Sequence, residues 1–161
     1  MAVENLVATS GNTYDPVIGH GDAGTVKGFS RTIEVTAAAS DTSTYTFGYI
    51  PSNARILGIS RFSHDDLAST GSPTMDIGLY PVNGNFTTGD VDAINDGIDV
   101  ATAAATVALV KDIANYGLSA WDFVNGLTAD PGGSMEVRVT LDDADTNTGG
   151  TITMELFYLL P

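Results

Sequence analysis

The sequence predicts an all-β protein, an antiparallel sandwich or barrel with one short helix, and three observations support this fold class. Segment after segment alternates between apolar and polar residues with a period of two and is closed by Gly, Asn, Asp, Ser or Pro. Sixteen of the 20 acidic residues are aspartate, which favours turns and disfavours the interior of helices and strands. Only one stretch of the chain has the spacing of an amphipathic helix.

Five segments place apolar side chains on one face of a predicted strand. These faces consist of Phe29, Ile33, Val35 and Ala37; Tyr45, Phe47 and Tyr49; Met75, Ile77 and Leu79; Met135, Val137, Val139 and Leu141; and Ile152, Met154, Leu156, Tyr158 and Leu160. Pro81 closes the third strand, because proline cannot donate a hydrogen bond to a sheet. The last two segments flank the polar stretch "DDADTNTGG", so we expect them to pair as an antiparallel hairpin.

A short helix is predicted in the stretch "GLSAWDFVNGL". Leu118, Trp121 and Val124 recur at helical spacing, and Ser119 is suited to the N-cap position. We expect this helix to lie on the sheet. The stretch "GDVDAINDG" is interpreted as one further helical turn that begins at Asp90.

The chain divides into an extended N-terminal arm, residues 1–27, and a single β domain, residues 28–161. The arm is rich in glycine and poor in large apolar residues, whereas the length of the chain suffices for one domain with its own core. Such an arm either frays or becomes ordered on a neighbouring molecule. The sequence leaves both interpretations open.

Charge and composition exclude several classes of function. With 20 acidic and 6 basic residues the formal net charge is -14, and the basic residues are scattered, so we expect binding neither to nucleic acid nor to membranes. The chain contains no run of roughly 18 uncharged apolar residues, and its first residues lack the pattern of a secretion signal. Without cysteine, neither disulfides nor thiolate metal sites can form.

The stretch "SRFSHDDL" places a histidine beside two aspartates and is the first candidate for a catalytic or metal site. Side chains alternate between the faces of a strand, so only His64 and Asp66 would share a face, and two ligands do not form a metal site. A Ser-His-Asp triad depends on geometry and not on adjacency, and the chain has no Gly-x-Ser-x-Gly motif. We therefore interpret this stretch as the polar end of a strand and expect no enzymatic activity.

The stretch "DDADTNTGGTITME" is the second candidate, because Asp143, Asp145 and Asn147 match the opening of a calcium-binding loop. The later positions do not match, since Thr148 stands in place of the glycine and Met154 in place of the glutamate. We interpret the stretch as a polar hairpin loop and expect no cofactor and no metal. Weak calcium binding is the alternative, either here or at Asp90, Asp92, Asp96 and Asp99.

The aromatic row of Tyr45, Phe47 and Tyr49 is the third candidate. A row of aromatic rings on a sheet either belongs to the core or to a subunit interface, or it is exposed and stacks on sugar rings. The sequence favours the core or the interface.

Four segments, "TSTYTFGYIPSNARILGISRF", "TMDIGLYPVNG", "LSAWDFVNGLTADPGGSMEVRVTL" and "GTITMELFYLLP", are similar to segments of a known family. This family is a group of small virion proteins of tailed bacteriophages, the capsid decoration or cement proteins. The resemblance covers residues 28–161 and rests on positions that determine the fold, not on a catalytic motif.

The resemblance implies a β-sandwich, of a jelly-roll-like form, that attaches to the outer surface of an icosahedral phage head. It implies the major capsid protein as partner, a homotrimer as the oligomeric state, and a location on the outer capsid surface of the virion after synthesis in the host cytoplasm. A carbohydrate-binding or host-adhesion module of a virion is the alternative function.

Two groups of residues are expected to make the contacts that this function needs. Capsid contact is assigned to the arm residues Thr13, Tyr14, Asp15, Pro16 and Val17. The subunit interface is assigned to Tyr45, Phe47 and Tyr49.

Overall fold

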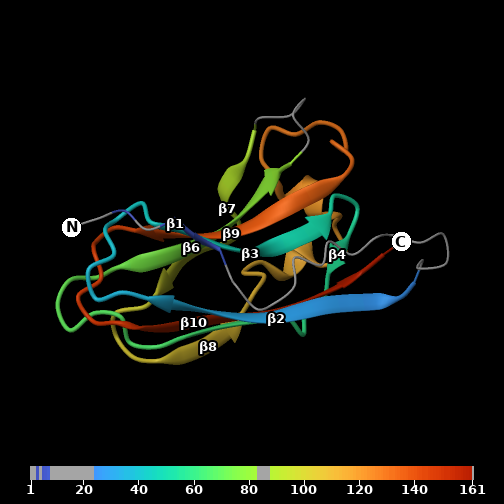
Figure 1. Ribbon diagram of the computed structural model, residues 1–161. Coiled ribbons are helices and arrows are strands. Elements are labelled where there is room, and N and C mark those ends of the chain that lie inside the picture. Colours follow the sequence, from blue (N-terminus) through green and yellow to red (C-terminus); the bar gives the residue numbers. More distant parts are fainter. Residues whose placement is uncertain (1–2, 4, 8–23, 83–87, 161) are drawn as a thin grey trace.

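The fold consists of two β-sheets that pack face to face, which confirms the predicted antiparallel β-sandwich (Figure 1). The computed structural model describes residues 3, 5–7, 24–82 and 88–160. Sheet I contains, in spatial order, β1 (Asn5–Val7), β3 (Thr44–Pro51), β9 (Ser134–Asp142), β6 (Thr74–Pro81) and β7 (Asp90–Asp99). Sheet II contains β2 (Val26–Val35), β10 (Gly150–Leu159), β5 (Arg61–His64) and β8 (Ala105–Ala108), and β4 (Arg55–Ile56) also pairs with β10.

The strand pairs are nested along the chain. The pair β6–β7 is innermost in sequence, and β5–β8, β3–β9 and β2–β10 enclose it in turn. All four pairs are antiparallel, and successive pairs lie alternately in sheet I and sheet II. The chain therefore resembles one long antiparallel ribbon that is wound into two sheets.

The inner faces of β9 and β10 form the centre of the core. Met135, Val137, Val139 and Leu141 on β9 are fully buried, as are Ile152, Met154 and Leu156 on β10, which confirms the alternation read from the sequence. The predicted hairpin between these segments is wrong, because β9 lies in sheet I and β10 in sheet II. Their two apolar faces are opposed across the sandwich, so the loop 143–149 crosses from one sheet to the other.

A β-bulge in β3 divides the predicted aromatic row. Thr46 pairs with Arg138 of β9 and Gly48 with Val137, so Phe47 is one extra residue in the strand. The extra residue reverses the alternation beyond it. Phe47 faces inward as Tyr45 does and is fully buried, whereas Tyr49, which lies beyond the bulge, is 40% exposed on the outer face of sheet I.

Phe47 joins the two sheets through its ring and its carbonyl group. Its ring meets that of Phe62 on β5 edge to face, with centroids 6.3 Å apart and an interplanar angle of 78°. Its carbonyl oxygen accepts a hydrogen bond from Nη1 of Arg31 on β2. The guanidinium group of Arg31 also lies over the Phe29 ring, 5.0 Å from the centroid.

The predicted helices are shorter than expected or absent. Within the predicted stretch only η2 (Ala120–Phe123), one 3-10 turn, is formed, and the Ser119 side chain makes no capping hydrogen bond. A second 3-10 turn, η1 (Ile113–Asn115), is capped by Asp112, whose side chain accepts from the Ala114 amide. The helical turn predicted at Asp90 is wrong, because this segment forms strand β7. No helix in the described ranges is long and apolar enough to cross a membrane.

The predicted N-terminal arm belongs in part to the sheets. Asn5–Val7 form β1, which pairs with β3 in parallel, and β2 begins at Val26. The Thr44 hydroxyl donates a 2.7 Å hydrogen bond to the Asn5 side chain and so fixes the start of β1. Residues 8–23 lie outside the described residues.

The bulge predicts opposite outcomes for two neighbouring aromatic positions. Phe47→Asp places a carboxylate in the core and should lower the free energy of unfolding by more than about 3 kcal/mol. Tyr49→Asp replaces an exposed side chain and should change it by less than about 1 kcal/mol. Chemical denaturation of both variants measures the difference; a loss for Tyr49→Asp as large as that for Phe47→Asp would contradict the bulge, because without it both side chains would face the core.

Candidate interaction surface

In the stretch Ser63–Asp66, no hydrogen bond joins the ring of His64 to a carboxylate. His64 is the last residue of β5; it is buried, and its Nδ1 atom lies 2.9 Å from the Asp65 carbonyl oxygen. Asp66 lies in the following loop, where its carboxylate accepts from the Ala68 amide. The Asp65 carboxylate accepts hydrogen bonds from the amide and the hydroxyl of Thr151, and these bonds lower its pKa. This stretch therefore connects β5 to the start of β10.

The loop that resembles a calcium site holds together the end of the sandwich. Asp143 accepts from the Thr74 hydroxyl, Asp145 from the Asp41 amide, and Asn147 from the Ser69 amide at 2.7 Å. These side chains thus bind other loops. Among the described residues, no group of three or more potential metal-ligating side chains is found.

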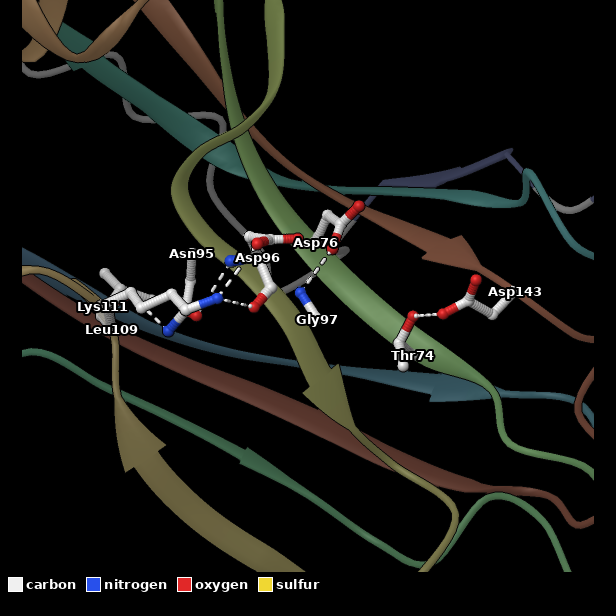
Figure 2. A network of polar contacts seen from close by, with 8 residues as sticks. All are labelled: Thr74, Asp76, Asn95, Asp96, Gly97, Leu109, Lys111 and Asp143. Carbon is white, nitrogen blue, oxygen red and sulfur yellow. Dashed lines mark hydrogen bonds and ion pairs between the residues drawn. The ribbon is translucent and has the colours of Figure 1, made fainter.

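Asp96 of β7 also has a structural partner (Figure 2). Asp96 forms a 3.0 Å ion pair with Lys111, whose ammonium group also donates to the Asp96 carbonyl oxygen. Asp76, on the neighbouring strand β6, is only 6% exposed and accepts a 2.8 Å hydrogen bond from the Gly97 amide. Burial raises the pKa of Asp76, and the carboxylates of Asp142, Asp96 and Asp143 raise it further.

The outer face of sheet I carries a cluster of polar and aromatic side chains around Arg138, which we call the Arg138 cluster: Thr46, Tyr49, Tyr80, Glu136 and Arg138. Strand register brings these residues together, because Glu136 of β9 lies between Tyr49 of β3 and Tyr80 of β6. Glu136 and Arg138 form a bidentate ion pair with N–O distances of 3.0 and 2.7 Å. The Thr46 hydroxyl donates a further hydrogen bond to Glu136.

Arg138 and Tyr80 fix each other by stacking. The guanidinium carbon of Arg138 lies 4.1 Å from the centroid of the Tyr80 ring. Gly89 packs closely against the same ring, since a Cβ atom at this position would lie 1.9 Å from Cδ1 of Tyr80. Only glycine fits there without displacement of the ring. The cluster is therefore a rigid patch that combines tyrosine and arginine, residues that are enriched at protein interfaces.

The pKa of the Glu136 carboxyl group is lower than the ordinary value for glutamate. Burial raises its pKa, but the hydrogen bonds from Arg138 and Thr46 outweigh this effect, so the net pKa is lowered. The same ion pair raises the pKa of Arg138. Both groups are therefore charged over a wide pH range.

The structure describes the residues predicted for the subunit interface but not those predicted for capsid contact. Tyr45 and Phe47 are fully buried within the domain, so the interface role predicted for them is wrong, since neither side chain can reach a second subunit. Tyr49 is exposed and keeps this role as a prediction. The capsid-contact residues Thr13–Val17 lie outside the described residues.

The two ends of the sandwich differ in charge. The acidic end consists of the segments 35–44, 64–74, 99–105 and 142–150, which contain seven aspartates and neither lysine nor arginine. The opposite end, which we call the β4 end, consists of the described residues of 51–61, 81–91 and 108–134. Its sequence contains four aspartates and three basic residues, Arg55, Arg61 and Lys111. In Figure 1 the loops of the acidic end lie together at the left, and β4 lies on the other side of the molecule.

Exposed large apolar side chains are concentrated at the β4 end. Ile113 is 78% exposed, Ile59 60%, and Tyr116 and Leu118 each 37%, and all four lie at the β4 end. In the four segments of the acidic end no large apolar side chain is exposed; Val3, which is 54% exposed, precedes β1 next to this end. The sequence could not reveal this asymmetry, because the residues of each end are distributed over the whole chain and meet only through the topology.

Removal of the Glu136 charge is expected to destabilise the fold in a pH-dependent way. Because folding lowers the pKa of Glu136, the stabilisation is present above the ordinary value of 4.5 and is lost as the pH falls through the lowered value. Glu136→Gln should therefore lower the free energy of unfolding by about 1–2 kcal/mol at pH 7 and by less at pH 3. Denaturant titrations at both pH values test this, with the exposed Glu155→Gln as control; an equal loss at both would contradict it.

Removal of the Asp76 charge is expected to have the opposite effect. Folding raises the pKa of Asp76, so its ionisation opposes folding as the pH rises above 3.8 through the raised value, and the full penalty is present at pH 7. Asp76→Asn keeps an acceptor for the Gly97 amide and should raise the free energy of unfolding by roughly 1 kcal/mol at pH 7. Thermal melts against the exposed Asp122→Asn measure the gain; a loss of stability at pH 7 would overturn the assignment.

Comparison with known proteins relates the fold to phage capsids. No family model and no curated protein matches the chain. The structure is similar to a chain of the capsid asymmetric unit of cyanophage Pam1, with a TM-score of 0.56 and 20% identity over 90% of this chain and 91% of that chain. It is also similar to a chain of the capsid of Ralstonia phage GP4, with a TM-score of 0.60 and 19% identity over 87% and 88% of the two chains. The chain thus shares its fold with chains from two phage capsids.

Proposed function

We propose that this chain is a structural protein of a phage head that binds the outer surface of the capsid and stabilises the shell without catalysis. The observation that carries the proposal is the likeness to chains of two phage capsids. In both comparisons the coverage of the two chains is nearly equal, so the matched chains have about the length of this one. The likeness therefore extends over the whole domain and is not confined to a common substructure.

The order of the strands supports this proposal. The nested antiparallel pairs and the two four-stranded paths β3-β9-β6-β7 and β2-β10-β5-β8 have the pattern that we assign to a jelly roll. The jelly roll is a fold of viral capsid domains, although it also occurs in lectins and other proteins. The fold alone does not define a function, and the capsid origin of the two similar chains favours the first of these classes.

Charge supports a location outside the shell. A chain with a net charge of -14 is repelled by packaged DNA, and this repulsion is strongest on the inside of a filled head. On the outer surface the same charge keeps the particles apart from one another. We therefore propose the virion surface as location. From the family resemblance we propose the major capsid protein as partner and the host cytoplasm as the place of synthesis.

Preferential binding explains how such a protein would stabilise a shell. A protein that binds the assembled shell more tightly than its free subunits shifts the equilibrium toward the assembled state by mass action. Several linked copies bind more strongly than one, because each further contact is intramolecular once the first has formed. A homotrimer, with Tyr49 in the subunit interface, is the oligomeric state that we propose.

We do not propose a carbohydrate-binding module, because such a module would need an exposed row of aromatic rings. Of the predicted row only Tyr49 is exposed, and one ring provides little area for stacking on a sugar. The proposal of a protein without catalytic function is likewise supported by Asp65 and Asp143, whose carboxylates accept hydrogen bonds from Thr151 and Thr74 within the fold.

Co-sedimentation with empty, expanded shells of the major capsid protein from the same genome tests the proposal. We expect saturable binding at a ratio set by the lattice, and a higher melting temperature of the decorated shells. A variant in which Thr13–Val17 are replaced by glycine and serine tests the predicted arm contact while it leaves β1 intact. Absence of binding to both expanded and unexpanded shells would contradict the proposed function.

A further inference from the structure

We infer that the β4 end is the surface that docks on the shell and that the acidic end faces the solvent. This inference rests on the proposed function, since it names the face of the folded domain that contacts the capsid in addition to the predicted arm contact at Thr13–Val17. It commits to one partner: an apolar patch on the outer surface of the capsid protein, with carboxylates near its rim. The charge distribution, the exposed apolar groups and the rigidity of the β4 end each support it.

Docking on a partner would cost more desolvation free energy at the acidic end than at the β4 end. Burial of the acidic end would remove the water from exposed carboxylates such as Asp66, Asp99 and Asp142, and no lysine or arginine in the same segments could compensate their charge. The β4 end has almost no net charge, because its three basic residues nearly balance its four aspartates. Desolvation therefore opposes docking much less at the β4 end.

Docking would also bury exposed apolar side chains of the β4 end, which favours binding. Ile113 and Ile59 are more than half exposed at 78% and 60%, and each of them places an apolar side chain in water. Tyr116 provides an aromatic surface in the same region, since a Cβ atom on Gly58 would lie 3.2 Å from its Cζ atom. The turn that carries Ile59 and the loop that carries Tyr116 are therefore in contact. Exposed apolar residues from two such segments are typical of an interaction surface.

These two segments are held in place by hydrogen bonds, so docking would cost little conformational entropy. The Leu109 amide donates to the Ser60 carbonyl oxygen, which connects the start of one loop to the end of the other. Nη1 of Arg61 donates to the carbonyl oxygens of Gly58 and Ser60 at 2.8 and 2.9 Å. Asp112 caps the turn that carries Ile113 through a 2.8 Å bond from the Ala114 amide.

The basic residues define the rim of the expected partner surface. Arg55 and Arg61 flank, in sequence, the turn that carries Ile59, and both are exposed. In a chain with only 6 basic residues, their position beside the apolar turn favours a partner with carboxylates around an apolar patch. A second copy of this chain is a poorer partner for this end, because contact between two β4 ends would place Arg55 and Arg61 of one copy against those of the other.

Charge-introducing substitutions at the two ends test the inference. Ile113→Asp and Ile59→Asp add a carboxylate to the β4 end, and Ala103→Asp adds the same charge at an exposed position of the acidic end. We expect each isoleucine variant to bind expanded shells at least about tenfold more weakly than the unmodified chain, and Ala103→Asp to bind like it. Circular dichroism and melting temperatures identify any variant that fails to fold; for such a variant, Ile113→Ser or Ile59→Ser replaces it.

The outcomes separate this inference from the proposed function. If the unmodified chain does not bind shells, the proposed function fails and the inference fails with it. If the chain binds but the isoleucine variants bind equally well, or if only Ala103→Asp loses binding, the docking surface is wrong while the function stands. A decrease in native mass of Ile113→Asp would show that the patch joins copies of the chain, which would also overturn the inference.

Discussion

The one extra residue in β3 is the constraint on which much of the structure depends. Without the bulge at Phe47, the alternation of the strand would place Tyr49 in the core and Ile50 in solvent. With it, Ile50 is buried and Tyr49 is exposed, while Phe47 meets Phe62 of the other sheet and its carbonyl oxygen accepts a hydrogen bond from Arg31 of β2. The same residue therefore fixes the contact between the sheets at one edge and determines which aromatic side chain stands beside Glu136 on the outer surface.

Alternation in the sequence predicts the fold class and most of the core, because it reflects which face of each strand is buried. It predicts correctly that Met75, Val137 and Leu156 point inward. Alternation does not predict which strands pair. The sequence predicts a hairpin of β9 and β10, yet these strands belong to opposite sheets. Two strands that face each other across a core show the same alternation of apolar and polar residues as two neighbours in one sheet. Alternation also does not reveal a bulge, so the sequence placed Tyr49 on the same face as Tyr45 and Phe47.

The candidate surface was less predictable than the fold. The Arg138 cluster forms because Glu136 is registered between strands that lie far apart in sequence, and no local pattern marks such a register. The contrast between the acidic end and the β4 end arises in the same way, since the nested strand pairs gather loops from all parts of the chain. What the sequence does show is the excess of aspartate; the topology collects about half of the net charge at one end, because seven of the aspartates lie there.

Electron cryo-microscopy of shells decorated with the purified chain would show whether the two ends of this sandwich have different roles. We expect density in which the turn 57–60 and the loop 112–118 lie against the shell and the loop 143–149 is outermost. The outer loop would then remain in solvent with its carboxylates hydrated. Density with the loop 143–149 against the shell and the turn 57–60 exposed would show that the β4 end is not the docking surface.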